Sequence, residues 1–452
     1  MSRSDIALAY FRKHEKETDK RVNEGIERYR KGTAKLRFVD KAGNALEGVE
    51  VSYDLKKHAF GFGANLFMLD EFEAPEKNEA YKDIFPSIFN LATLPFYWRD
   101  QEPEQGKPRY KADSPKIYRR PPADLCLAYC KEKGIEPKAH CLNYDHFLPA
   151  WLKGCSVDEH KKALEKRFAE LSALYAKEIP SWEVTNETFN VPFARELHST
   201  TYSAFYREPD FVKWSYRMAK KYFPHNHLII NDHTDFGCLR APDSDFFGTR
   251  SPYYMQIERI LEDSESKLDS IGFQYHCFIA KEMEERIAKT RYNPEHLFDV
   301  LDTYARLGLK LQMTEMTVSA LGDSQEDEWV QAEIARNLYR IFFSHPAMEA
   351  IIYWNLVDGY AYGKLGDMTN DENKFRGGFL NFDLSPKPVF SVLKDLIKSE
   401  WHTKGTTFAK EGDAEFKGFF GEYEISVRHN GSETSHTVSL QENAENQFTI
   451  VL

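Results

Sequence analysis

Short apolar runs alternate with longer amphipathic stretches through the middle of the chain, from about residue 60 to about residue 400. The apolar runs have the length of buried β-strands, and the amphipathic stretches have the period of helices. Repetition of this βα unit predicts an α/β protein whose parallel sheet closes into a (β/α)8 TIM barrel. The predicted strands are Phe60–Phe67, Leu91–Phe96, Pro137–Leu142, Ser181–Glu187, Leu228–Asp232, Ser270–His276, Lys310–Glu315 and Ala350–Val357.

Both ends of the chain depart from this pattern. Charged residues with recurring apolar positions predict an N-terminal helix within residues 1–32. Residues 33–59 alternate at period two on both sides of a loop that contains Gly43, which predicts a β-hairpin. Residues 403–452 show similar alternation. We therefore expect a small accessory β-sandwich, built from the N- and C-terminal segments, beside a barrel of residues 60–402.

Polar and aromatic residues gather where the predicted barrel strands end. A packed barrel interior would not select such residues, whereas the C-terminal face of a barrel carries the active site. Glu187 and Glu315 lie at the ends of the fourth and seventh strands and are expected to face one another there. Two carboxyls placed in this way indicate glycoside hydrolysis. The residues at the strand ends are His140, Asn186, Glu187, Asn231, Asp232, Gln274, Tyr275, His276, Glu315 and Trp354.

Composition narrows the possible partners. A net charge of −11 offers no basic surface for nucleic acid or an anionic membrane, so an oligosaccharide or small glycoside is the expected partner. The chain as written has no signal peptide, which predicts a cytoplasmic protein, or a secreted one if a leader was removed. Six scattered cysteines are expected to be reduced thiols. The chemistry needs no metal or cofactor, and the sequence predicts no particular oligomeric state.

Several motifs occur in a fixed order along residues 60 to 400. They are Glu102-Pro103, His140, Trp182-Glu183-Val184-Thr185-Asn186-Glu187, Asn231-Asp232, Gln274-Tyr275-His276, Met313-Thr314-Glu315-Met316, Trp354 and Pro386-Lys387-Pro388. This series resembles glycoside hydrolase family 10, the xylanase family. The segment that ends at Glu187 is similar to the family's W-D-V-V-N-E, and the segment around Glu315 is similar to its nucleophile motif.

The resemblance implies a retaining double displacement, in which Glu315 is the ionised nucleophile and Glu187 is the protonated acid and later the base. Asn186 would bind the sugar 2-hydroxyl, and Gln274 and His276 would support Glu315 and the same sugar. The remaining expected contacts are a hydroxyl bound by His140 and an apolar floor formed by Trp354. Glu183 lies on the same side of its strand as Glu187, so alternation alone leaves it open as the acid, and only the family motif selects Glu187.

Departures from the family pattern bear on the substrate. The family's charged and amide donors for the sugar beyond the cleaved one are replaced by Thr93–Trp98, and its aspartate two positions after the nucleophile is Thr317. Tyr144 and Tyr362 stand near or at positions of other family binding residues, where they would stack on sugar. Two long loops, at residues 110–122 and 363–378, either wall the cleft or are simply solvated.

The sequence therefore favours a retaining β-glycosidase that acts on xylo-oligosaccharides or another small β-linked glycoside. One alternative is a secreted endo-β-1,4-xylanase. A second is a carbohydrate-binding protein with weak catalysis, since the Thr317 change removes an acidic partner from His276.

Overall fold

The fold is described from a computed structural model, which covers residues 2–188, 203–233 and 251–452. Parallel strands close into a barrel, because the last strand pairs with both the seventh and the first. In barrel order the strands are β3 (Gly61–Asn65), β4 (Leu91–Pro95), β5 (Glu136–His140), β6 (Ser181–Asn186), β7 (His227–Asp232), β8 (Ser270–Phe273), β10 (Lys310–Val318) and β11 (Met348–Tyr353). The predicted barrel is confirmed.

The sixth, seventh and last barrel strands differ in extent from their predicted ranges. The sixth stops at Phe273 and resumes as the short β9 (His276–Cys277), which pairs with the end of β10. The seventh runs on past Glu315 to Val318, so the nucleophile candidate lies within a strand and not at its tip. The last strand ends early, before Asn355, whose φ of 66° is incompatible with an extended strand.

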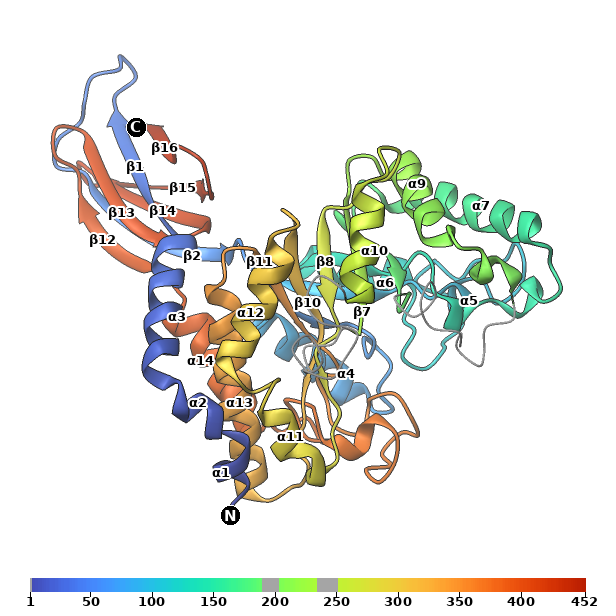
Figure 1. The fold of residues 1–452 in the computed structure, drawn as a ribbon. Helices are drawn as coiled ribbons and strands as arrows, with labels where there is room; N and C mark the ends of the chain where they lie inside the picture. Colours follow the sequence, from blue (N-terminus) through green and yellow to red (C-terminus); the bar gives the residue numbers. More distant parts are fainter. Residues whose placement is uncertain (1, 189–202, 234–250) are drawn as a thin grey trace.

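Helices cover the outside of the barrel, one after each strand, within the described ranges (Figure 1). Their inward faces are apolar and join the barrel strands in one continuous core. These helices are α4 (Pro75–Ile84), α6 (Ala123–Lys133), α7 (Val157–Tyr175), α9 (Phe211–Tyr222), α10 (Pro252–Leu261), α12 (Pro294–Ala305), α13 (Gln325–Ser344) and α14 (Pro388–Asp395). Shorter helices α5 (Trp98–Gln101) and α11 (Glu284–Ala288) lie in the loops.

The accessory module consists of two sheets built from both ends of the chain. One sheet has the order β13-β1-β16 and the other β12-β2-β14-β15. The strands are β1 (Lys31–Val39), β2 (Glu50–His58), β12 (Lys404–Phe408), β13 (Asp413–Phe419), β14 (Gly421–His429), β15 (Ser432–Leu440) and β16 (Gln447–Val451). Tyr53 of β2 stacks on Phe416 of β13 with ring centroids 4.0 Å apart, which joins the two sheets.

The predicted β-hairpin of residues 33–59 is wrong. β1 and β2 belong to different sheets, and each pairs with strands from the C-terminal segment. The period-two alternation correctly predicted that both segments are strands, but such a pattern does not indicate which strand each one pairs with. The predicted N-terminal helix is divided into α1 (Arg3–Ala7), α2 (Ala9–Lys13) and α3 (Glu15–Tyr29).

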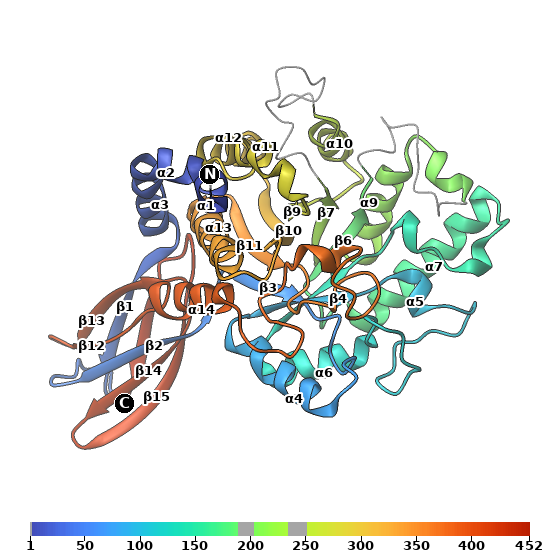
Figure 2. The ribbon, with the colours of Figure 1, turned by 90° about the horizontal axis from the view of Figure 1, so that it is seen from below.

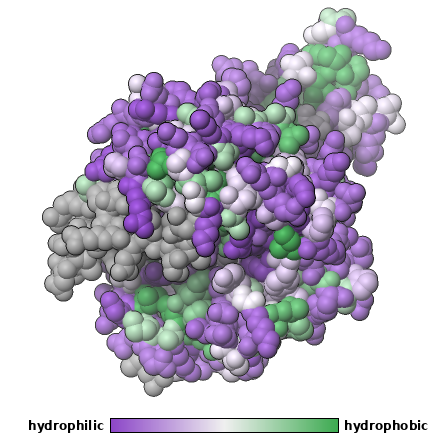
Figure 3. Space-filling model, turned by 90° about the vertical axis from the view of Figure 1, so that its right-hand side faces the viewer, coloured by the Kyte–Doolittle hydropathy of each residue, from purple (hydrophilic) through white to green (hydrophobic). Residues whose placement is uncertain are grey.

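The sandwich lies against one side of the barrel, next to α3 and α14 (Figure 2). Phe343 at the end of α13 stacks on Trp401 at 4.0 Å and also meets Phe419 of the sandwich at 6.0 Å. Arg30 donates hydrogen bonds to the carbonyls of Phe343 and Met348, so the helix that precedes β1 is fixed to the barrel. On the face drawn in Figure 3, hydrophilic residues predominate and apolar ones are scattered. No helix in the described ranges has the length and apolar character to cross a membrane.

Candidate active site

A cavity of about 280 Å³ opens at the C-terminal ends of the barrel strands. Its volume is near the lower end of the range for small-ligand sites, roughly 300–1,000 Å³. The nine residues that were given a catalytic or sugar-binding role from the sequence border it, from Glu187 and Glu315 to Tyr144 and Tyr362, whereas Asn231, Asp232 and Tyr275, also at the strand ends, do not. The full lining is Phe67, Tyr97, Arg119, Arg120, His140, Tyr144, His146, Phe147, Asn186, Glu187, Gln274, His276, Phe278, Glu315, Trp354, Tyr362 and Glu372.

Glu315 is buried and is held from two sides. The Asn231 side-chain amide donates to its Oε1 at 2.7 Å, and His276 Nε2 lies 3.2 Å from its Oε2. Asn231 is itself oriented, because its Oδ1 accepts a hydrogen bond from the Thr314 hydroxyl. Glycine at position 272 makes this packing possible, since a Cβ there would lie 2.7 Å from Thr314 Cγ2 and 2.8 Å from a backbone oxygen.

The electrostatic environment of Glu315 favours the protonated acid. Burial raises its pKa to about 8; the nearby positive charge of His140 opposes this shift, and the Glu183 and Glu187 carboxylates add to it. This differs from the expectation of an ionised nucleophile. Interacting carboxyls titrate as a unit, so the cavity keeps a carboxyl proton at neutral pH, and the retaining reaction requires that Glu187 carry it.

Glu187 lies directly after β6, with a φ of 53° in the left-handed region. The Tyr144 hydroxyl donates to its Oε2 at 2.6 Å, and the Gln274 amide donates to its Oε1 at 3.1 Å. Gln274 also donates to Asn186 Oδ1 at 3.0 Å, and Asn231 donates to the same oxygen at 2.8 Å. A continuous series of side-chain amides therefore connects the two carboxyls.

Glu183 occupies the barrel interior and does not border the cavity. Its two carboxylate oxygens are engaged by Lys138 and His140. Although burial opposes it, these two cations lower the pKa of Glu183 to about 2, and Glu183 in turn raises the pKa of His140. His140 thus lies between two carboxyls, because its Nδ1 is engaged by Glu183 and also lies 3.8 Å from Glu315 Oε1. This fully engaged carboxylate is not a free acid, which supports its rejection in favour of Glu187.

His140, Glu183 and Glu315 also form the one group in the described ranges whose donor atoms have the spacing of a metal site, within 4.8 Å of one another. Lys138 already supplies a positive charge to this group, and His140 Nδ1 is engaged by Glu183. The donor set is therefore neutralised by side chains, and the chemistry described below uses no metal.

His276 contacts Thr317 where the family pattern would place an acidic partner. The Thr317 hydroxyl lies 3.1 Å from His276 Nδ1, in the position where a carboxylate would make the ring basic. Burial lowers the pKa of His276 to about 4, so the imidazole is neutral. One ring nitrogen of the neutral imidazole faces Glu315 and the other faces the Thr317 hydroxyl, which also lies 3.4 Å from the Trp354 carbonyl.

Aromatic rings form one wall of the cavity. Trp354 has its ring centroid 5.1 Å from Phe67 and 5.5 Å from His140. Tyr97 is packed 5.1 Å from His140 and 4.4 Å from Phe147. Tyr362 is 53% exposed and so lies at the rim. This apolar surface suits the face of a sugar ring.

Both long loops wall the cavity, which resolves the alternative left open by the sequence. Residues 110–122 supply Arg119 and Arg120, and residues 363–378 supply Glu372. Sequence patterns did not single out these three residues as contacts, nor Lys138. Asn231 was recognised as part of a motif, but its hydrogen bond to Glu315 was not foreseen.

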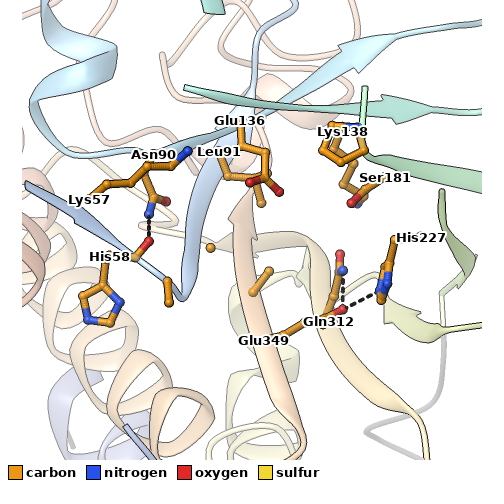
Figure 4. Close-up of a pocket in the computed structure, with 14 residues that line it drawn as sticks. Lys57, His58, Asn90, Leu91, Glu136, Lys138, Ser181, His227, Gln312 and Glu349 are labelled. Carbon is orange, nitrogen blue, oxygen red and sulfur yellow. Dashed lines mark hydrogen bonds and ion pairs between the residues drawn. The ribbon is translucent and has the colours of Figure 1, made fainter. Parts of the chain in front are cut away.

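A second cavity, of about 290 Å³, lies at the opposite end of the barrel, where the strands begin (Figure 4). Glu349 accepts hydrogen bonds there from Gln312 at 2.7 Å and from His227 at 2.9 Å. The N-terminal face of a barrel carries stabilising interactions and not the reaction. The paired glutamates therefore identify the C-terminal cavity as the candidate active site.

The family model of glycosyl hydrolase family 10 matches residues 69–396. Among curated relatives, the chain is 22% identical to anti-sigma-I factor RsgI6 of Acetivibrio thermocellus, over 90% of this chain and 46% of that protein. It is 25% identical to endo-1,4-beta-xylanase B of Neocallimastix patriciarum, over 60% of this chain and 28% of that protein. The chain thus spans less than half the length of these two relatives.

Other relatives are covered more fully. Endo-1,4-beta-xylanase B of Thermotoga neapolitana is 25% identical, over 71% of this chain and 84% of that protein. The crystal structure of xylanase 10B from Thermotoga petrophila in complex with xylobiose superposes with a TM-score of 0.59 at 20% identity, covering 76% of this chain and 95% of that one. This likeness supports the fold, and the family model covers well over half of the sequence. The chain therefore belongs to glycosyl hydrolase family 10.

Proposed function

We propose that the protein is a retaining β-glycoside hydrolase that cleaves xylo-oligosaccharides or another small β-linked glycoside. The observation that carries the proposal is the pair Glu187 and Glu315, which border one cavity and are joined by the amides of Asn231, Asn186 and Gln274. Family membership and the names of the xylanase relatives support the same reaction class.

In the first step Glu315 Oε attacks the anomeric carbon while Glu187 gives its proton to the departing glycosidic oxygen. The bond to the aglycone breaks with its electron pair, and a glycosyl ester forms on Glu315. In the second step Glu187 removes a proton from water, whose oxygen displaces Glu315 and restores the β configuration. The amides of Asn186 and Gln274 are placed to bind sugar hydroxyls as charge develops.

The shape of the cavity favours a short substrate. The loops at residues 110–122 and 363–378 both contribute to its walls, and the donors of the family's distal sugar subsite are replaced by Thr93–Trp98. A long polymer must be gripped on both sides of the cleaved bond, and the loss of these donors weakens that grip on the glycone side. Cleavage of oligosaccharides and aryl glycosides is therefore expected to exceed cleavage of polymeric xylan.

A product profile tests the proposal. Wild type and Glu315→Ala are compared on xylo-oligosaccharides, xylan and a panel of aryl β-glycosides, with the anomer followed by NMR. Release of a β-configured product by wild type alone is the expected result. Initial release of the α anomer, or wild-type turnover by Glu315→Ala, would overturn the mechanism. Tight calorimetric binding of an oligosaccharide without any product would instead identify a binding protein.

A further inference from the structure

Two arginines from the loop at residues 110–122, Arg119 and Arg120, border the cavity. Arg120 has an internal counter-ion: its Nε donates to Asp100 Oδ2 at 2.8 Å, and its guanidinium lies 4.1 Å from the centre of the Tyr97 ring. Its charge is therefore balanced by the protein itself. Arg119 is different.

Arg119 is only 5% exposed, yet within the described ranges no carboxylate lies within ion-pair distance of it. Its guanidinium donates to Asn355 Oδ1 at 2.7 Å and to the Tyr360 carbonyl. Its buried Nε has no hydrogen-bond partner in that part of the chain. Burial lowers the pKa of Arg119, and the carboxylate charge of Glu372 opposes this shift, but that carboxylate accepts its hydrogen bond from the Asn355 amide at 2.7 Å and forms no ion pair with the guanidinium.

Burial of an unpaired charge is costly, and a neutral amide and a carbonyl compensate only part of that cost. The backbone adds a second cost. Arg119 and Asn355 have φ values of 61° and 66°, in the left-handed region that non-glycine residues rarely occupy. Such residues persist where the surrounding structure holds them, and they are concentrated at ligand-binding sites. The guanidinium is thus held in place at the wall without a direct ion pair in the described part of the chain.

Arg119 lies among the aromatic residues that form one wall of the cavity. Its guanidinium lies 5.7 Å from the Phe67 ring, which packs 5.1 Å from Trp354. Arg120 stacks on Tyr97, whose ring is 5.1 Å from His140, the neighbour of Glu315. Trp354 is the expected floor under the glycone ring, so a guanidinium beside the Phe67–Trp354 pair is placed to meet the glycone or the sugar attached to it.

We propose that Arg119 pairs with a carboxylate carried by the glycone, so that the natural substrate is an acidic β-glycoside. The proposal rests on the glycosidase function above and adds its substrate class. A carboxylate matches the planar fork of a guanidinium and supplies the missing charge, whereas a hydroxyl supplies only an acceptor. The carboxylate belongs either to the cleaved sugar itself, as in a β-glucuronide, or to a uronic acid attached to the adjacent sugar.

The test uses matched substrates. Aryl β-glucuronide and aryl β-glucoside differ only in a carboxylate for a hydroxymethyl group, and a xylo-oligosaccharide with a uronic acid branch is compared with its unbranched form. For one pair, wild type is expected to favour the acidic substrate in kcat/KM by about 10- to 100-fold, the size of a charged hydrogen bond. The pair that shows this preference identifies the source of the carboxylate. Preference for the neutral member of both pairs would overturn the proposal.

Variants assign the preference to Arg119. Arg119→Gln should reduce the acidic-to-neutral ratio to near one, and Arg119→Lys should restore part of it. Arg99→Gln is the matched control, because Arg99 is close in sequence but does not border the cavity, and its ratio should equal that of wild type. An unchanged ratio in Arg119→Gln would refute the assignment.

A wild-type measurement keeps the test decisive if the Arg119 variants do not fold. Calorimetric binding of free glucuronate and of glucose to wild type is compared at low ionic strength, and tighter binding of glucuronate is expected. Glu315-dependent cleavage of neutral glycosides without any acidic preference would remove this inference and leave the glycosidase function intact. Absence of all hydrolysis would remove the function, while the binding comparison would still decide the role of Arg119.

Discussion

Replacement of the nucleophile by its neutral isostere should stabilise the free protein, in a manner that depends on pH. Burial raises the pKa of Glu315 from 4.5 to about 8, so the folded chain keeps a proton that the unfolded chain has lost. The contribution of Glu315 to the free energy of unfolding therefore falls as pH rises from about 4.5 to about 8. Each pH unit costs about 1.4 kcal/mol, so the loss between pH 4.5 and 7 is roughly 3 kcal/mol.

Glu315→Gln lacks this titration. Relative to wild type, the free energy of unfolding of the variant should rise by roughly 3 kcal/mol between pH 4.5 and 7 and become level above about pH 8. Urea unfolding followed by tryptophan fluorescence, at closely spaced pH values, measures this difference. A difference that is constant from pH 5 to 8 would show that the buried carboxyl carries no such cost, and the reasoning would be refuted.

Glu183→Gln provides a control of opposite sign inside the same barrel. The pKa of Glu183 is lowered to about 2, so its charge contributes stability above about pH 4.5 that is lost as pH falls toward 2. The variant should be less stable than wild type at neutral pH, by roughly 3 kcal/mol, and the deficit should shrink in acid. The same slope in both variants would show that the pH effect is not specific to either site.

Three further predictions concern the site. First, kcat/KM should fall about tenfold per pH unit above about pH 8, where the cavity loses the proton that the leaving group needs; a flat profile to pH 10 would contradict it. Second, Thr317→Asp should raise the pKa of His276 above about 4, because it sets a carboxylate against Nδ1; NMR titration of the ring would show an unshifted midpoint if the reasoning is wrong. Third, Gly272→Ala should reduce both stability, by about 1–3 kcal/mol, and kcat, because its Cβ would displace Thr314 and disturb Asn231; wild-type values in denaturation and kinetics would contradict this.

The sequence predicted the barrel because its signal is repeated and local. Each apolar run specifies a buried strand without reference to its neighbours, and the closing order follows from the βα alternation. It also brought His140, Asn186, Gln274, His276 and Trp354 together with the two glutamates, because the C-terminal ends of parallel strands share one face.

Features that depend on backbone irregularity or distant pairing were not predictable in this way. The register of β6 against β7 shifts between Glu183 and Thr185, and Glu187 is left-handed, so alternation could not decide between Glu183 and Glu187. The hairpin failed because pairing of β1 and β2 is decided by strands almost four hundred residues later. Arg119 lies in a loop without hydrophobic periodicity, and the feature that singles it out, a buried Nε without a hydrogen-bond partner in the described residues, is visible only in the structure.

The split origin of the sandwich has a consequence for the chain as it is made. β1 and β2 leave the ribosome early, but their partners begin at Lys404, after the entire barrel. At a translation rate of about 5–20 residues per second, the unpaired edges of β1 and β2 wait roughly 20–70 seconds for those partners. During that interval they are open to pairing with other nascent chains. Slow or paused synthesis of the barrel should therefore increase aggregation of the nascent chains.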